Sequence, residues 1–174
     1  MLVRTETPDD FDATRRIHTE AFARSGRDGP VAPEVALTDE LRCTTAYIPE
    51  LSLVAIAGSQ PVGHVISTRA TIGPDACPVL GLGPLGVLPS HQRQGVGIAL
   101  MEEMIERVES MGEPMIVLLG DPAYYSRFGF ESSSKFGIDP PVSGWALHFQ
   151  VRPGRTYDAS VRGLFTYAEP FDRV

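Results

Sequence analysis

The stretch from residue 79 to residue 111 constrains the fold most, because it joins an apolar strand, a glycine-containing turn and a long amphipathic helix. Val79–Val87 is predicted as a strand, and Pro84 within it predicts a bulge or an interrupted ladder, since proline cannot donate a ladder hydrogen bond. The spacing of apolar residues by three and four predicts a helix over Gly95–Met111. The apolar positions are Ile98, Met101, Met104, Ile105, Val108 and Met111.

The turn before this helix has the features of a phosphate-binding loop. It reads Gln92, Arg93, Gln94, Gly95, Val96, Gly97, Ile98. Gly95 and Gly97 have no side chain to keep a ligand from the backbone. The first turn of a helix has unpaired N–H groups and a partial positive charge. The pattern therefore predicts a pyrophosphate cradle, although a loop that only leads into a helix would have similar glycines.

Two other phosphate-binding loops do not fit. A Walker loop needs a Gly-Lys-Ser/Thr triplet, which this sequence lacks. A dinucleotide-binding fingerprint needs a third glycine, and Gly95-x-Gly97 has none at the required spacing. A nucleotide-binding protein of those classes is therefore disfavoured.

The remaining elements predict a single α/β (α+β mixed) domain over residues 1–174, in which helices flank a mixed sheet. Further strands are expected at Leu2–Thr5, Leu51–Ala57, Val62–Thr71, Met115–Leu119, Ala146–Val151 and Gly163–Tyr167. Further helices are expected at 7–22, at Glu34–Arg42 and, as a short one, from Asp121 to near Phe128. Thr7, Pro8 and two acids mark the first helix start.

Composition excludes several classes of function. The net charge of −7 argues against non-specific nucleic-acid binding, which needs a basic surface. No apolar run approaches the roughly 20 residues of a membrane helix, and the N-terminus lacks the pattern of a secretion signal, so a cytoplasmic protein is expected. The spacing of Cys43 and Cys77 fits no metal-ligand pattern, and no metal is predicted.

Two motifs resemble the GCN5-related N-acetyltransferase (GNAT) superfamily. Gln92–Gly97 matches its Q/R-x-x-G-x-G/A signature, between the fourth strand and the third helix. Leu82–Pro89 and Gly120–Phe130, with the sequences LGPLGVLP and GDPAYYSRFGF, resemble a bacterial branch of predicted N-acetyltransferases. The resemblance implies an acyl-CoA N-acyltransferase fold, with a mostly antiparallel central sheet that is splayed at the cofactor site.

The resemblance also implies an acetyl-CoA site. The backbone of Leu85, Gly86 and Val87 would bind the pantetheine arm as an added strand would. The N–H groups from Arg93 to Ile98, in the turn that Gln92 opens, would bind the pyrophosphate, and the Arg93 side chain would add a charge.

Tyr125 occupies the position of the family tyrosine that protonates the departing thiolate. A phenol with a pKa near 10 and a thiol with a pKa near 8.5 make this transfer nearly balanced. A tyrosine that only packs in the core is the alternative, and Tyr124 is expected to pack inward. Many family members have an asparagine seven residues before the tyrosine, where this chain has Leu118, so the cofactor contact of that asparagine is expected to be absent or made otherwise.

The family reaction is direct attack of an amine on the thioester in a ternary complex, which needs a base because alkylamines are protonated at neutral pH. Cys43 and Cys77 lie outside both motifs and are not proposed as nucleophiles. Candidate bases are Glu20, Glu34, Asp39, Glu40 and His64, and the sequence does not rank them. By family analogy the loop 25–33, with Arg27 and Asp28, and the C-terminal segment, with Trp145, Tyr157 and Phe165, line the acceptor cleft.

The expected acceptor is an amine of a small molecule or peptide, and the expected cosubstrate is acetyl-CoA. The acidic balance favours a cationic acceptor. A non-catalytic acyl-CoA-binding or regulatory module is the main alternative function, and a thioesterase or the transfer of another acyl group is a third. A homodimer is left open.

Overall fold

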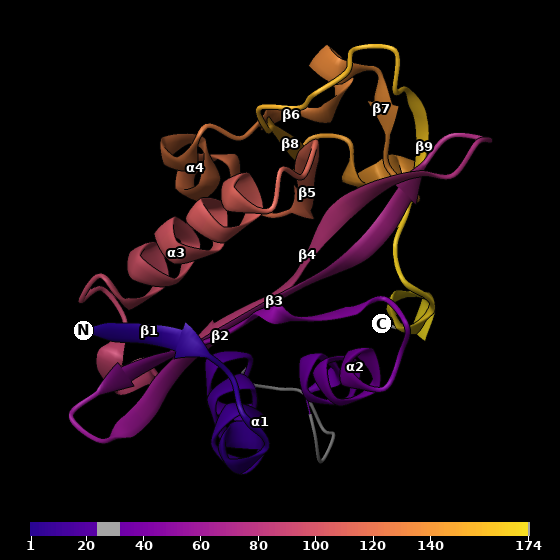
Figure 1. Ribbon diagram of the computed structural model, residues 1–174. Helices are drawn as coiled ribbons and strands as arrows, with labels where there is room; N and C mark the ends of the chain where they lie inside the picture. The colour runs from indigo at the N-terminus through magenta and orange to yellow at the C-terminus, as the bar shows by residue number, and fades with distance from the viewer. Residues whose placement is uncertain (24–31, 174) are drawn as a thin grey trace.

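The computed structural model describes residues 1–23 and 32–173, which form a mixed α/β fold around one open, mostly antiparallel sheet (Figure 1). The main path of the sheet runs β1-β2-β3-β4-β5-β8-β6, and β9 pairs with β3 and β7. The strands are β1 (Leu2–Thr5), β2 (Tyr47–Ala57), β3 (Gln60–Ile72), β4 (Cys77–Val87), β5 (Met115–Leu119), β6 (Glu131–Ser132), β7 (Ile138–Asp139), β8 (Phe149–Pro153) and β9 (Gly163–Thr166). The predicted fold class is confirmed.

Helices cover both faces of the central strands. Figure 1 shows α1 and α2 on one side of the sheet and α3 on the other. The helices are α1 (Phe11–Ala21), α2 (Pro33–Arg42), α3 (Val96–Ser110) and the single turn α4 (Pro122–Tyr125). No helix within the described residues has the length and apolar character needed to cross a bilayer.

The amphipathic pattern predicted for α3 places its apolar side against the sheet. Leu100, Met101, Met104 and Val108 are at most 1% exposed and belong to the main core cluster, which also contains side chains of β2, β3, β4 and β5. The opposite side of α3 carries its charged residues. This packing therefore fixes the rotation of the helix about its axis.

Strand boundaries differ from the prediction where local irregularity hides the pattern. β2 begins at Tyr47 rather than Leu51, because its ladder with β3 shifts register between Tyr47 and Ser52, around Pro49. The strand expected from Ala146 begins at Phe149, since a 3-10 turn over Ser143–Trp145 precedes it. The two-residue strands β6 and β7 are too short to show an alternating pattern.

The strands β4 and β5 separate after two paired residues. They run parallel and pair where residues 80–81 of β4 lie beside 116–117 of β5. β4 continues its ladder with β3 as far as Val87, but the register shifts opposite Pro84. The interruption predicted from Pro84 is confirmed, and in the described sheet the edge of β4 from 82 to 87 has no strand beside it toward β5.

A chain of polar side chains is buried on the α1 and α2 side of the sheet. Glu6 and Arg42 form an ion pair at 2.5 Å, with side chains 0% and 5% exposed. Ser52 Oγ lies 2.7 Å from Glu6 Oε2 and 3.1 Å from His64 Nε2. His64 Nδ1 lies 2.8 Å from His18 Nε2. The chain joins Glu6, the residue that follows β1, to α1, α2, β2 and β3.

The Glu6 carboxylate sets the direction of these hydrogen bonds, since an ionised carboxylate only accepts. Ser52 therefore donates to Glu6, His64 Nε2–H donates to Ser52, and His18 Nε2–H donates to His64 Nδ1. Burial lowers the pKa of His18 and of His64, so both rings are neutral near pH 7. His18 Nδ1 is left unprotonated, with no hydrogen-bond partner among the described residues.

The Glu6–Arg42 ion pair predicts a pH-dependent stability. Burial opposes ionisation of Glu6, but hydrogen bonding by His64 Nε2, 3.4 Å from Glu6 Oε1, and the hydrogen bonds and positive charge of Arg42 outweigh burial and hold the Glu6 pKa below its ordinary value. Glu6→Gln leaves Arg42 buried without this counter-charge, so we expect the free energy of unfolding to fall by about 3 kcal/mol at pH 7. Urea denaturation measures it. The stabilisation by Glu6 is present above its unfolded pKa and is lost as pH falls through the folded pKa, so the difference from wild type should shrink below about pH 4.

The matched control is Glu20→Gln, which removes an exposed carboxylate paired with Arg16 at 3.6 Å. It should change the free energy of unfolding by less than about 0.5 kcal/mol. Equal stability of Glu6→Gln and wild type at pH 7 would contradict the role given to this ion pair.

Candidate functional site

Two glutamine side chains hold the turn between β4 and α3. Gln92 Nε2 donates to the Val87 carbonyl at 3.1 Å, and Gln94 Nε2 donates to the Ser90 carbonyl at 2.9 Å. These bonds tie the turn to the end of β4 and to the 3-10 turn over Pro89–His91. The amide donors of both glutamines are therefore bound to the protein backbone, and the turn keeps its shape through them.

Two residues of this turn have a left-handed backbone. Arg93 has φ 58° and Gly95 has φ 84°. Left-handed residues beside right-handed ones direct successive N–H groups into a concavity that binds anions. The first hydrogen bond of α3 runs from the Ala99 N–H to the Gly95 carbonyl at 2.9 Å, so the N–H groups just before Ala99 have no acceptor within the helix. The backbone here is suited to an anionic ligand.

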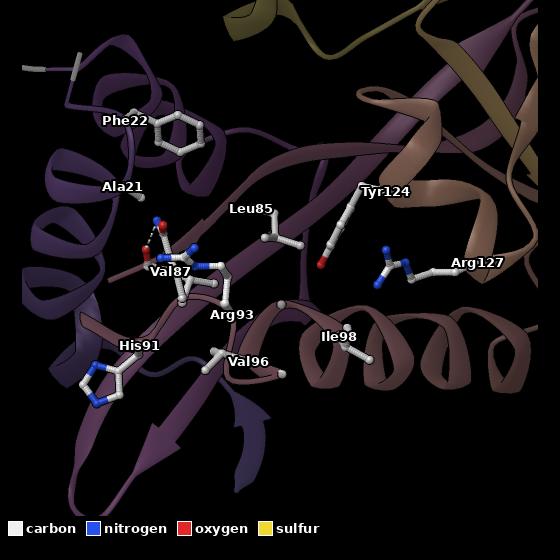
Figure 2. A pocket seen from close by; sticks show the side chains of 13 residues that line it. Ala21, Phe22, Leu85, Val87, His91, Arg93, Val96, Ile98, Tyr124 and Arg127 are labelled. Atoms are coloured by element: carbon white, nitrogen blue, oxygen red, sulfur yellow. Dashed lines mark hydrogen bonds between the residues drawn. The ribbon is translucent and has the colours of Figure 1, made fainter. Parts of the chain in front are cut away.

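A cavity of about 550 Å³ lies against the turn and the end of β4 (Figure 2). Eight of the predicted cofactor residues line it, namely Leu85, Val87, Gln92, Arg93, Gly95, Val96, Gly97 and Ile98. Gly86 and Gln94 do not line it. Gly86 instead faces α1, where an added Cβ would lie 2.9 Å from His18 Nδ1.

Five residues that the sequence analysis did not assign to the cofactor also line this cavity: Ala21, Phe22, His91, Tyr124 and Arg127. Figure 2 shows the Arg127 guanidinium near the Tyr124 ring, and its central carbon lies 5.1 Å from the ring centroid. Arg93 and Arg127 bring positive charge to the cavity, which favours phosphate groups. Arg127 lies within the second motif, Gly120–Phe130, and this position in the sequence could have indicated that it belongs to the site.

The two adjacent tyrosines of α4 face different cavities. Tyr124 was expected to pack inward, but its hydroxyl reaches the first turn of α3, where a Cβ added to Gly97 would lie 2.6 Å from it. The two rings cross at 89° with centroids 4.9 Å apart. Tyr125 packs against Phe130 and the core, and burial raises its pKa to about 12. The Tyr125 hydroxyl is therefore protonated at neutral pH.

A second cavity of about 360 Å³ lies on the other side of Leu85 and contains Tyr125 in its wall. Its lining is mostly apolar and aromatic: Phe22, Glu34, Leu37, Leu82, Gly83, Pro84, Leu85, Leu119, Tyr125, Trp145, Tyr167 and Phe171. Phe22 and Leu85 belong to both cavities. A ligand along the open edge of β4 would therefore pass from one cavity toward the other.

The structure separates the five candidate bases. Three form ion pairs away from both cavities: Glu20 with Arg16 at 3.6 Å, Asp39 with Arg42 at 2.6 Å and Glu40 with Arg173 at 2.6 Å. His64 is fully buried in the chain of Glu6 and Ser52 and lines neither cavity. Glu34 lines the second cavity.

The residues expected at an acceptor cleft divide in the same way. Glu34 and Trp145 line the second cavity, whereas Tyr157 packs on Phe136, and Phe165 is buried in the core at 0% exposure. Arg27 and Asp28 lie outside the described residues. Leu118 is 1% exposed in the main core cluster, so it packs there and leaves no polar group in place of the family asparagine.

Comparison with known proteins agrees with this geometry. Residues 2–133 match the model of the acetyltransferase (GNAT) domain. The chain is 30% identical to the uncharacterized N-acetyltransferase YhbS of Escherichia coli, over 99% of both chains. It is 39% identical to the uncharacterized N-acetyltransferase YjhQ of Escherichia coli, over 70% of this chain and 65% of that protein, just under two thirds.

Solved structures extend the comparison. The crystal structure of the E. coli YhbS N-acetyltransferase in complex with CoA has a TM-score of 0.86 at 29% identity and covers 99% of this chain and 92% of that one. A GNAT family acetyltransferase of Brucella melitensis in complex with acetyl-CoA has a TM-score of 0.76 at 31% identity, over 98% and 97%. The family match, the relatives and the shared fold together show that this chain belongs to the GNAT family of N-acetyltransferases.

Proposed function

We propose that this chain binds acetyl-CoA in the first cavity and transfers its acetyl group to an amine held in the second. The observation that supports the proposal is the shared wall at Leu85. The open edge of β4 lies there between the turn before α3, whose N–H groups suit an anion, and a second, mostly apolar cavity. Acetyl-CoA has a phosphate-rich end and a thioester end, and the two cavities suit these ends. The CoA and acetyl-CoA complexes of the similar YhbS and Brucella proteins support this cosubstrate.

Each part of the cofactor has a proposed partner. The backbone of Leu85, Gly86 and Val87 pairs with the pantetheine arm, since this edge has no strand toward β5 among the described residues. The N–H groups from Arg93 to Ile98 bind the pyrophosphate, as anions bind the first turn of a helix. The Arg93 side chain adds charge. Gln92 and Gln94 act by holding the turn.

The reaction is direct attack of the amine on the thioester within a ternary complex. Tyr125 donates a proton to the sulfur as the thiolate departs. Its raised pKa keeps the phenol protonated at neutral pH, so the proton is in place when the C–S bond breaks. Because the pKa is about 12, the donor remains protonated from pH 7 to about pH 11, and Tyr125 itself should impose no alkaline loss of activity in that range.

The remaining parts of the proposal come from the sequence and its composition. One domain over residues 1–174 acts on an amine of a small molecule or peptide, in the cytoplasm, with no nucleic-acid or membrane partner and no metal. A homodimer is compatible with the proposal. A non-catalytic acyl-CoA-binding module would need the turn but not Tyr125, so turnover of acetyl-CoA with an amine separates the two functions.

The pyrophosphate cradle is tested by Gly97→Glu. The variant places a side chain and a negative charge at the first turn of α3, so acetyl-CoA binding measured by isothermal titration should weaken at least about 100-fold. Ser110→Glu adds the same charge at the other end of α3 and should leave the affinity unchanged. Circular dichroism establishes that both variants are folded. If a folded Gly97→Glu variant bound acetyl-CoA as tightly as wild type, the pyrophosphate would not bind at this turn.

Tyr125→Phe tests the acid. We expect kcat to fall about 100-fold or more, the usual contribution of a positioned acid, while the dissociation constant of acetyl-CoA stays within about twofold. Tyr157→Phe is the control, because Tyr157 packs on Phe136 outside both cavities. Release of free CoA measures turnover for both variants. Unchanged kcat in Tyr125→Phe would leave Tyr125 a packing residue.

A further inference from the structure

We propose that the acceptor is a primary amine carrying an aromatic or bulky apolar group and no carboxylate, and that Glu34 binds its ammonium group and takes its proton. The inference rests on the proposed acetyl transfer and names the substrate class of the same site. Three observations carry it: the position of Glu34, the character of the cavity walls, and the ion pairs that occupy the other acids.

Glu34 has an unsatisfied oxygen at the second cavity. It lies in the first turn of α2, where the partial positive charge of a helix N-terminus favours a carboxylate. Its Oε2 is buried and has no hydrogen-bond partner among residues 1–23 and 32–173. A buried carboxylate oxygen without a partner is costly, and an ammonium group in the cavity would satisfy it.

The other candidate acids are already paired with arginine side chains. Asp39 pairs with Arg15 and Arg42, and Glu40 pairs with Arg173. Among the described residues that line the second cavity, Glu34 is the charged side chain. An acceptor with its own carboxylate would therefore meet the like charge of Glu34, and no cation in this lining would offset it. This disfavours amino acids as acceptors relative to amines without a carboxylate.

The walls of the cavity suit a flat apolar group. Phe22, Trp145, Tyr167 and Phe171 contribute aromatic surface, and the rings of Tyr167 and Phe171 stack with centroids 4.2 Å apart. Aromatic faces attract cations as well as apolar groups. A volume of about 360 Å³ accommodates a ring with a short alkylamine chain. The aromatic walls and the Glu34 carboxylate together favour an amine in which the ammonium group and the ring lie close to each other.

The Glu34 carboxylate takes one proton from the ammonium group, and the free amine attacks the thioester carbonyl carbon, forming the C–N bond. The C–S bond breaks, the sulfur leaves with the electron pair, and Tyr125 gives it a proton. The new amide nitrogen gives its surplus proton to the Tyr125 phenolate through solvent, and Glu34 releases its proton to solvent.

Glu34→Gln tests the role of the carboxylate, with 2-phenylethylamine as acceptor. At pH 7 we expect kcat/KM for the amine to fall at least about 100-fold, as for loss of a general base, with acetyl-CoA affinity unchanged. Toward pH 9.5 the free amine becomes abundant, because its pKa is near 10, and the defect should shrink. Glu40→Gln, on the same helix and outside the cavity, should behave as wild type. Wild-type kinetics in Glu34→Gln, or a defect that is the same at both pH values, would overturn the role of Glu34.

A matched series tests the substrate class on the wild-type chain. We expect kcat/KM for 2-phenylethylamine to exceed that for phenylalanine, which adds a carboxylate, and that for propylamine, which lacks the ring, each by at least about tenfold. Transfer to phenylalanine or propylamine at an equal or higher rate would overturn the substrate class and leave acetyl transfer intact. Failure to bind acetyl-CoA by titration would instead remove the proposed function on which this inference rests.

Discussion

The separation of two parallel strands in the middle of the sheet is the constraint on which the site depends. Once β5 diverges from β4, backbone groups along residues 82–87 lose the neighbour that a continuous sheet would provide, and unpaired groups away from water are costly. Pro84 lowers this cost because it has no N–H to satisfy. The remaining groups form a strand edge inside the protein, and a linear ligand with amide groups is the partner that fits such an edge.

Much of the fold could be predicted from the sequence where the signals are local. Apolar spacing predicted α3, and Pro84 predicted the interrupted ladder, because each depends on neighbouring residues. The two-residue strands β6 and β7 have no periodicity to detect. The buried chain from Glu6 to His18 joins residues far apart in sequence, and nothing in their local surroundings indicates that they meet. Pairing between polar groups that are far apart in the sequence leaves no local signal and therefore could not be predicted.

The candidate site divides in a similar way. The turn from Gln92 to Gly97 is continuous in sequence, so its residues could be named in advance. A helix of one turn gives no periodicity from which to infer which tyrosine faces which cavity, and Tyr124 was assigned wrongly to the interior. Five candidate bases could not be ranked, because their ion pairs come from distant elements. Glu34 is distinguished by the cavity beside it rather than by its sequence.

Leu85 and Phe22 stand between the two cavities, and this position couples them. A thioester arm laid along β4 would complete a wall of the acceptor cavity and exclude water from it. Any gain in acceptor affinity from that wall must be matched by an equal gain in cofactor affinity when the acceptor is bound, since thermodynamic linkage is reciprocal. The shared wall would thus couple the two binding steps by the same factor, whichever ligand enters first.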